Sequence, residues 1–275
     1  MWTDLKQILA MAEAKSVAVP AFNCYNMESV MGIAQAAKET GAPVIFQMFT
    51  RMMDTEFGSY VAAAIREAIN QLVTPAVMHL DHGKGIPQVL RALRLGCTSV
   101  MIDASTKPLE QNIALTRQVV KICGECGVFV EGELGHVGGT ADEKISDFTD
   151  VAEAERFAKE TGVVAIAVMV GTAHGIYKSA PVLDIERTRK IHQLTGLPLV
   201  LHGGSGVPDE QVKMVVEAGV RKINFATDLV YAFFNSVYDK NGEICAMDVF
   251  MQEPVESIKQ YAISKIKLLG TDKLA

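Results

Sequence analysis

Three histidines occupy comparable positions in the chain, each at the carboxyl end of a different apolar, strand-like run. They are His82, His174 and His202. One histidine in such a position is more often a hydrogen-bonded structural residue, but three that converge on one rim are better explained as metal ligands. A catalytic zinc ion needs three protein ligands and one open coordination position. We therefore predict that these histidines bind one divalent metal ion.

An aspartate lies directly before the first of these histidines. Asp81 and His82 are adjacent, and adjacent residues of a regular strand point to opposite faces of the sheet. At least one of them must therefore lie where the chain turns if both are to reach the same site. The spacing leaves two roles open for Asp81, namely a general acid–base or a partner that orients a metal-bound histidine.

A glycine-rich turn indicates an anion site near the third histidine. The residues Gly203-Gly204-Ser205-Gly206 precede a helix whose start is marked by Pro208. Backbone N–H groups in such a turn, together with the dipole of the following helix, favour phosphate binding. The pattern indicates little by itself and depends on where the fold places the turn.

The elements that must position these residues alternate along the chain. Apolar runs, each typical of a strand buried on both faces, are separated by helical patterns; they cover 16–22, 42–48, 75–81, 99–105, 128–134, 163–171, 197–203 and 222–227. Eight such repeats predict an α/β fold, a closed (β/α)₈ barrel, in which reactive groups gather at the carboxyl ends of the strands. Loops after the seventh and eighth strands commonly bind phosphate in this architecture. We expect one domain, 1–275, with a helical tail after Thr227 and a polar active-site loop at 135–150.

Composition excludes several functional classes. The chain has 275 residues and a formal net charge of −6, without a basic patch, so neither nucleic acid nor a membrane surface is an expected partner. No apolar run reaches membrane-spanning length, and the amino terminus does not resemble a signal peptide. The odd and low count of five cysteines favours the reducing cytoplasm. The Cys123-x-x-Cys126 spacing stands alone, so we interpret it as structural rather than as a zinc or redox motif.

The motifs at the strand ends resemble those of the class II, metal-dependent ketose-bisphosphate aldolases, which include fructose- and tagatose-1,6-bisphosphate aldolases. The resemblance covers nearly the whole chain and rests on VPAFN (19–23), HLDHG (79–83), SVMIDAS (99–105), VEGELG (130–135), GTAHGIYK (171–178), LHGGSG (201–206) and KINFATDL (222–229). It implies a TIM barrel that cleaves a phosphorylated ketose reversibly to dihydroxyacetone phosphate and an aldehyde such as glyceraldehyde 3-phosphate. It also implies a homodimer or homotetramer.

The resemblance assigns roles by position. It implies Zn²⁺ on His82, His174 and His202, and an Asp81 that exchanges a proton with the C4 hydroxyl of the ketose. It matches Asp103 and Glu133 to carboxylates near an alternative metal position, which leaves room for a second divalent or a monovalent cation. Substrate contacts carry over to Asn23, Gly175, Gly203, Gly204, Ser205, Asn224, Phe225, Ala226 and Thr227.

Two departures from the family pattern affect substrate contacts. The second strand usually carries Q-x-S, whereas this chain has Gln47-Met48-Phe49. The loop after the fifth strand usually reads G-G-x-E-D, and here Ala141 replaces its glutamate. We hypothesise that Glu143 takes over the loop's proton-transfer role. The departures leave two alternatives open, an aldolase for a different ketose phosphate or a non-catalytic metal- and phosphate-binding subunit of a sugar-catabolic complex. Arg51 and Lys178 could meet a second phosphate, although surface cations are usually only solvated.

Overall fold

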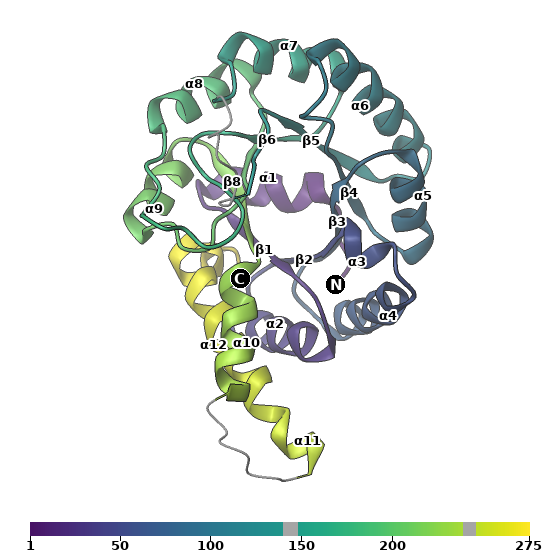
Figure 1. Cartoon of the computed structure of the whole chain (residues 1–275), viewed down its shortest axis with the longest axis vertical. Helices are drawn as coiled ribbons and strands as arrows, with labels where there is room; N and C mark the ends of the chain where they lie inside the picture. The colour runs from purple at the N-terminus through teal and green to yellow at the C-terminus, as the bar shows by residue number, and fades with distance from the viewer. Residues whose placement is uncertain (140–147, 239–245) are drawn as a thin grey trace.

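Eight parallel strands form a closed barrel in which neighbours along the chain are also neighbours in the sheet (Figure 1). The computed structural model describes residues 1–139, 148–238 and 246–275. The strands are β1 Val19–Asn23, β2 Val44–Phe49, β3 Ala76–Gly83, β4 Ser99–Ile102, β5 Phe129–Leu134, β6 Ala165–Val168, β7 Leu199–Leu201 and β8 Val220–Phe225. The predicted (β/α)₈ architecture is confirmed.

Helices cover the outside of the barrel and its amino end, so the strands are buried on both faces. They are α1 Leu5–Lys15, α2 Met27–Thr40, α3 Thr50–Met53, α4 Glu56–Gln71, α5 Ile86–Leu95, α6 Leu109–Gly124, α7 Val151–Thr161, α8 Ile185–Thr195, α9 Asp209–Glu217, α10 Thr227–Tyr238, α11 Met247–Phe250 and α12 Gln252–Leu269, with a 3₁₀ turn at Thr271–Leu274. Within the described ranges, none of these helices is long and apolar enough to span a bilayer.

Each predicted strand exists, but its bounds differ by a few residues. The largest difference is in the sixth, expected over 163–171, because β6 ends at Val168. Gly171 then has a φ of +118°, which an extended strand does not tolerate. The chain therefore leaves the sheet early, and the released residues form the loop that carries His174.

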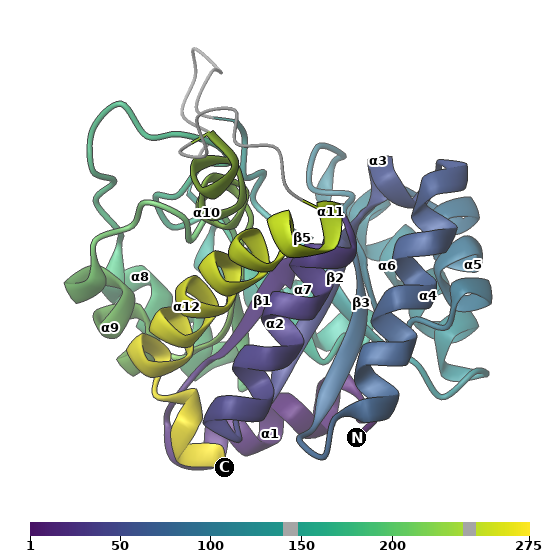
Figure 2. The same cartoon turned by 90° about the horizontal axis from the view of Figure 1, so that it is seen from below.

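The amino end of the barrel is closed by helix α1, which crosses beneath the strands (Figures 1 and 2). The side chain of Asp4 caps this helix by accepting a hydrogen bond from the Gln7 backbone N–H at 2.8 Å. Its buried face packs into an apolar cluster with inward-facing strand residues; the buried members are Leu5, Ile8, Leu9, Ala12, Val17, Val19, Ala21, Ile45, Val77, Met101, Ala165, Ala167 and Val200.

After β8, the chain continues into helices that pack on the outside of the barrel. Helix α12 lies against α2 and α10 (Figure 2). The contact with α2 is close at Gly32, where a Cβ atom would lie 2.6 Å from Cγ2 of Ile258. A glycine is therefore required there for the two helices to approach. In this way the C-terminal helices hold the first βα unit beside the last strand.

Candidate active site

The three predicted ligand histidines converge at the carboxyl end of the barrel. His82 belongs to the last residues of β3, His174 to the loop after β6, and His202 directly follows β7. Their candidate ligand nitrogens all lie within 4.8 Å of one another. Nε2 of His82 is 2.9 Å from Nδ1 of His202, and the ring centroids of His82 and His174 are 5.0 Å apart. The structure thus brings together the set that the sequence predicted.

A local backbone distortion lets both Asp81 and His82 face this site. The strand pairing between β3 and β4 shifts between Leu80 and Gly83, and His82 adopts a left-handed conformation with a φ of +54°. Such a φ is uncommon for a residue other than glycine and tends to occur at functional sites. The sequence required one of the two residues to lie beyond the regular strand. The structure instead places the irregularity inside the end of β3.

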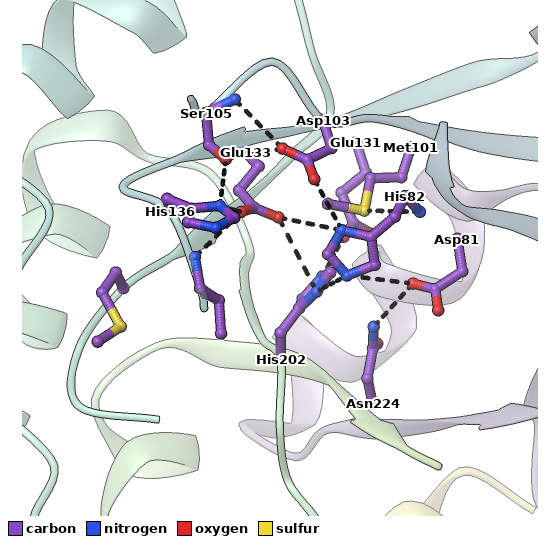
Figure 3. A network of polar contacts seen from close by, with 12 residues as sticks. Asp81, His82, Met101, Asp103, Ser105, Glu131, Glu133, His136, His202 and Asn224 are labelled. Carbon is purple, nitrogen blue, oxygen red and sulfur yellow. Dashed lines mark hydrogen bonds and ion pairs between the residues drawn. The ribbon is translucent and has the colours of Figure 1, made fainter. Parts of the chain in front are cut away.

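Carboxylate groups lie close to a ring nitrogen of His82 and of His202 (Figure 3). Nδ1 of His82 is 3.0 Å from Asp103 and 3.6 Å from Glu133. Nε2 of His202 is 3.0 Å from Glu131. A carboxylate behind an imidazole fixes its tautomer and ring orientation and makes the other nitrogen a better metal ligand. Asp103 and Glu133 therefore support the histidine set and, with His82, also form a second group that could hold a cation.

The protonation preferences of the site suit a divalent metal ion. Burial lowers the pKa of His174 to about 4, with His82 acting in the same direction, and burial also lowers the pKa of His202 well below its usual value. Burial opposes the charge on His82 too, but Asp81, Asp103 and Glu133 raise its pKa to about 9. Two histidines thus offer neutral nitrogens, and the carboxyl groups around the third favour a positive charge at its position.

Unpaired polar atoms indicate where such an ion fits. Nε2 of His174 and Oε2 of Glu133 are buried and have no hydrogen-bond partner among the described residues. An unpartnered buried polar atom costs free energy unless an ion, water or ligand satisfies it. Both residues belong to the candidate ligand groups. The donor set of imidazoles and carboxylates is the one that zinc accepts.

Two amides hold the carboxylate of Asp81. Asn23 donates to one oxygen at 2.9 Å, and Asn224 donates to the other at 3.2 Å. Asn23 in turn accepts a hydrogen bond from Gln47 at 2.7 Å. Although burial opposes ionisation of Asp81, the charges of His82 and other neighbouring groups and the Asn23 hydrogen bond lower its pKa overall. Asp81 therefore presents an oriented carboxylate, favoured in its ionised form, beside the histidines.

A buried ion pair lies below these groups. Glu131 and Lys222 are fully buried, with Lys222 Nζ 3.0 Å from Glu131. Lys222 also donates to the side-chain oxygen of Asn224 at 2.7 Å, which turns the Asn224 amide toward Asp81. The sequence interpretation missed both charged residues. Their signal was strand alternation, since Glu131 shares a face with Glu133 and Lys222 shares a face with Asn224.

The predicted phosphate residues lie on the β6–β8 side of the same mouth. Gly203 has a φ of +67°, and a Cβ there would lie 2.3 Å from the Ala173 carbonyl oxygen. The hydroxyl of Tyr177 connects the loop after β6 with the loop after β7. It accepts a hydrogen bond from the Ala173 N–H at 2.8 Å and donates one to the Gly203 carbonyl at 2.9 Å. The predicted residues that line the cavity on this side are Gly175, Gly203, Ser205, Asn224, Ala226 and Thr227.

Two residues of the predicted phosphate set face elsewhere. The Gly204 N–H donates to the Asn224 carbonyl at 3.0 Å, so it is not free for an anion. The Phe225 side chain is fully buried and packs against Phe22 and Tyr261. The sequence alone did not predict the hydrogen bond of the Gly204 N–H or the burial of the Phe225 side chain. Glu143, the predicted loop residue, lies outside the described residues.

The histidines, Asp81 and the glycine turn open into one cavity of about 560 Å³. Its β1–β3 side is lined by residues to which the sequence assigned no firm role; they are Tyr25, Phe49, Arg51 and Lys84. The Phe49 ring lies 5.6 Å from the His82 ring, so the aromatic replacement in the Q-x-S motif contacts the candidate metal centre. His136 also lines the cavity, and its Nδ1 is 3.2 Å from Ser105 Oγ.

A (β/α)₈ barrel that gathers three histidines, an oriented aspartate and a glycine-rich turn at the carboxyl ends of its strands has the arrangement expected of a barrel enzyme with a metal centre. Residues 3–273 match the family described as fructose-bisphosphate aldolase class-II, and the chain belongs to this family. It is therefore a class II aldolase, a carbon–carbon lyase. Family membership, together with Asp81 oriented beside the histidines, supports an enzyme over the non-catalytic alternative.

Similar proteins include aldolases with different named substrates. A 6-phospho-5-dehydro-2-deoxy-D-gluconate aldolase from Bacillus velezensis is 35% identical over 278 residues, which cover 98% of this chain and 96% of that protein. The crystal structure of the YdjI aldolase from Escherichia coli has a TM-score of 0.90 and 32% identity, covering 99% of this chain and 98% of the other. A putative fructose-1,6-biphosphate aldolase from Coccidioides immitis has a TM-score of 0.90 at 26% identity, covering 97% and 96%.

Proposed function

We propose that this chain is a zinc-dependent aldolase that reversibly cleaves a ketose phosphorylated beside its carbonyl group, releasing dihydroxyacetone phosphate and an aldehyde. The observation that carries the proposal is the convergence of His82, His174 and His202 around the Asp81 carboxylate in one cavity. When bound by these histidines, zinc would supply a Lewis acid that polarises the carbonyl and stabilises the ene-diolate charge.

Asp81 accepts and returns the proton in this proposal. In cleavage, the bond breaks between the carbon next to the carbonyl and the carbon that carries a hydroxyl group, and a base must remove the proton of that hydroxyl. In condensation, the same proton must be returned to the oxygen. The amides of Asn23 and Asn224 hold the two Asp81 oxygens in place. An oriented base needs little reorganisation before proton transfer, which contributes to the rate.

The β6–β8 side of the cavity binds the phosphate. The turn at Gly203 and the start of α10 at Thr227 lie on that side, and α10 is long enough to offer a helix N-terminus to an anion. Binding energy from this remote group orients the reacting carbons without altering them. This arrangement supports a phosphorylated donor, such as dihydroxyacetone phosphate, over an unphosphorylated one.

Two substrate classes remain candidates within this reaction. Fructose- or tagatose-1,6-bisphosphate is the substrate implied by the motifs. The aromatic Phe49 in the cavity and the likeness to 6-phospho-5-dehydro-2-deoxy-D-gluconate aldolases support the second class, a keto acid phosphate. By its name, that compound carries a carboxylate at the end remote from its phosphate, where the bisphosphates carry a second phosphate.

A substrate panel with metal analysis tests the proposal. The purified protein is stripped with a chelator, restored with zinc, and assayed for release of dihydroxyacetone phosphate from both bisphosphates and from the keto acid phosphate. We expect activity on at least one substrate that disappears with the chelator and returns with zinc. Equal inactivity on every ketose phosphate after zinc is restored would contradict the aldolase proposal.

The loop role proposed for Glu143 and the oligomeric state have separate tests. If Glu143 moves the donor proton, Glu143→Ala lowers turnover; full turnover in that variant, beside an inactive Asp81→Ala, would exclude the role. We also propose a homodimer or homotetramer. Light scattering of the purified protein measures its mass in solution, and a monomer at micromolar concentration would contradict this expectation.

A further inference from the structure

Two cations line the cavity on the side facing away from the glycine turn. Arg51 lies in α3, just after β2, and Lys84 follows the end of β3. Both side chains are exposed and both line the 560 Å³ cavity. In the described parts of the chain, neither forms an ion pair with a carboxylate. Both positive charges are therefore available to a ligand in the cavity.

Phe49 gives Arg51 a defined position. The guanidinium carbon of Arg51 lies 5.9 Å from the centroid of the Phe49 ring, within the range of a cation–π contact. The same ring lies 5.6 Å from the His82 ring. A planar guanidinium held on a ring loses less conformational entropy when it binds a carboxylate or phosphate through paired hydrogen bonds. The residue that interrupts the Q-x-S pattern thus supports a cation beside the reaction centre.

The order of the strands separates this cation pair from the phosphate side. In a closed barrel of eight strands in chain order, β3 and β7 lie on opposite sides. Lys84 follows β3 and Gly203 follows β7, while Asp81 and His82 line the same cavity. A substrate with its phosphate at the glycine turn and its reacting carbons at Asp81 therefore directs its far end toward Arg51 and Lys84.

We propose that Arg51, seated on Phe49 and assisted by Lys84, binds an anionic group at the far end of the substrate. This inference rests on the proposed aldolase function and deepens it, because it names the residues that recognise the carboxylate or phosphate carried by the released aldehyde. Both anions suit a guanidinium fork, so the chemistry they share is a terminal oxyanion. A neutral aldehyde leaves the two cations unpaired and gains nothing from them.

Condensation of dihydroxyacetone phosphate with three small aldehydes tests the proposal on the zinc-loaded protein. Glyceraldehyde is neutral, glyceraldehyde 3-phosphate carries a phosphate, and malonic semialdehyde carries a carboxylate. We expect a higher kcat/KM with an acidic aldehyde than with the neutral one. Preference for malonic semialdehyde assigns the site to a carboxylate, and preference for glyceraldehyde 3-phosphate assigns it to a phosphate.

Variants at Arg51 assign the preference to this residue. We expect Arg51→Gln to lower the acidic-to-neutral ratio of kcat/KM by roughly 10- to 100-fold, the range for a lost charged hydrogen bond. Arg51→Lys keeps the charge without the planar fork, so it should recover part of the ratio. Arg94→Gln is the matched control, because Arg94 is exposed on α5 and does not line the cavity. An unchanged ratio in Arg51→Gln, or no preference in the native protein, overturns the proposal.

Failure of the aldolase function can be distinguished from failure of the role of Arg51 by a separate measurement. The donor half-reaction, exchange of a dihydroxyacetone phosphate C–H proton with deuterated solvent, does not involve the far end of the substrate. Exchange without an acid preference contradicts only the role of Arg51. Absence of exchange and of condensation with all three aldehydes contradicts the aldolase function itself.

Discussion

The two ends of the barrel are built from the same strands but have opposite chemistry. At the amino end, inward positions are apolar and pack against Ile8 and its neighbours on α1. At the carboxyl end, inward positions carry imidazoles, carboxylates and amides. The change occurs within single strands, since β3 presents Val77, then His79, then Asp81 to the interior.

Because of this difference, the amino ends of the strands mainly stabilise the fold, and the carboxyl ends carry the groups proposed for catalysis. Burying apolar surface stabilises the fold, whereas burying charged groups is costly unless each is paired. The amino end therefore supplies stabilisation that the carboxyl end does not. The charged groups are paired into a network through contacts such as Glu131 with Lys222. Substitutions at the two ends should accordingly have different readouts, with activity lost at one end and stability lost at the other.

The largest effect should follow Asp81→Asn at the carboxyl end. The amide cannot accept the substrate proton, so we expect kcat to fall by roughly 10²- to 10⁴-fold, the usual contribution of a general base. Zinc content, measured by elemental analysis, should stay near that of the native protein. Asp54→Asn is the control, because Asp54 is an exposed carboxylate that follows α3 and does not line the cavity. Loss of zinc parallel to loss of activity would instead make Asp81 a structural residue of the metal site.

A smaller effect of another kind should follow Ile8→Ala at the amino end. Ile8 is fully buried between α1 and the strands, so its truncation should lower the free energy of unfolding by about 2–5 kcal/mol. Below the melting transition, kcat/KM should remain near the native value. Urea unfolding and steady-state kinetics measure the two quantities, with the exposed Lys15→Ala on the same helix as control. A loss of kcat/KM without a loss of stability would remove the distinction between the ends.

The sequence predicted the barrel because parallel strands and their covering helices leave a periodic signal. It also predicted which residues converge, since strand ends in this architecture meet on one rim. His82, His174 and His202 could therefore be grouped without coordinates. Directions were harder to predict, as at Gly204 and Phe225, because the group that faces the cavity depends on backbone turns formed by distant loops.

The buried support of the site was also missed from the sequence. Glu131 and Lys222 lie inside predicted strands, but we assigned a role to neither of them, and their pairing joins residues far apart in the chain. Pairings across the barrel depend on strand register, which single-strand patterns do not specify. The irregularity at His82 was expected from its neighbour Asp81, but its location within β3 required the observed pairing with β4.

Glu131→Gln tests whether a residue that contacts a candidate ligand, but is not itself one, affects zinc affinity. Loss of the carboxylate behind His202 should weaken zinc binding by roughly 10- to 100-fold, measured by competition with a chromogenic chelator. The variant also leaves the buried Lys222 charge unpaired, so stability should fall. Glu131→Gln with Lys222→Met should regain stability but not zinc affinity. Recovery of both would assign Glu131 to stability alone, and Glu125→Gln at an exposed site controls for loss of charge.

The smallest effect concerns the Cys123-x-x-Cys126 pair, which lies where α6 ends and the chain turns back into β5 at the amino end. Burial raises the pKa of Cys123 to about 11 and that of Cys97 to about 12, so both thiols stay protonated at neutral pH. Among the described cysteines, only Cys126 is exposed.

A thiol reagent applied to the folded protein should therefore modify Cys126 first, and kcat/KM should not change. Mass spectrometry of labelled peptides identifies the site, and Cys126→Ser should remove that fast reaction. Cys245 lies outside the described residues, so a Cys245→Ser background isolates the signal from Cys126. If modification of Cys126 inactivated the protein, the amino end would also affect activity. The distinction between a stabilising amino end and an active carboxyl end would then be wrong.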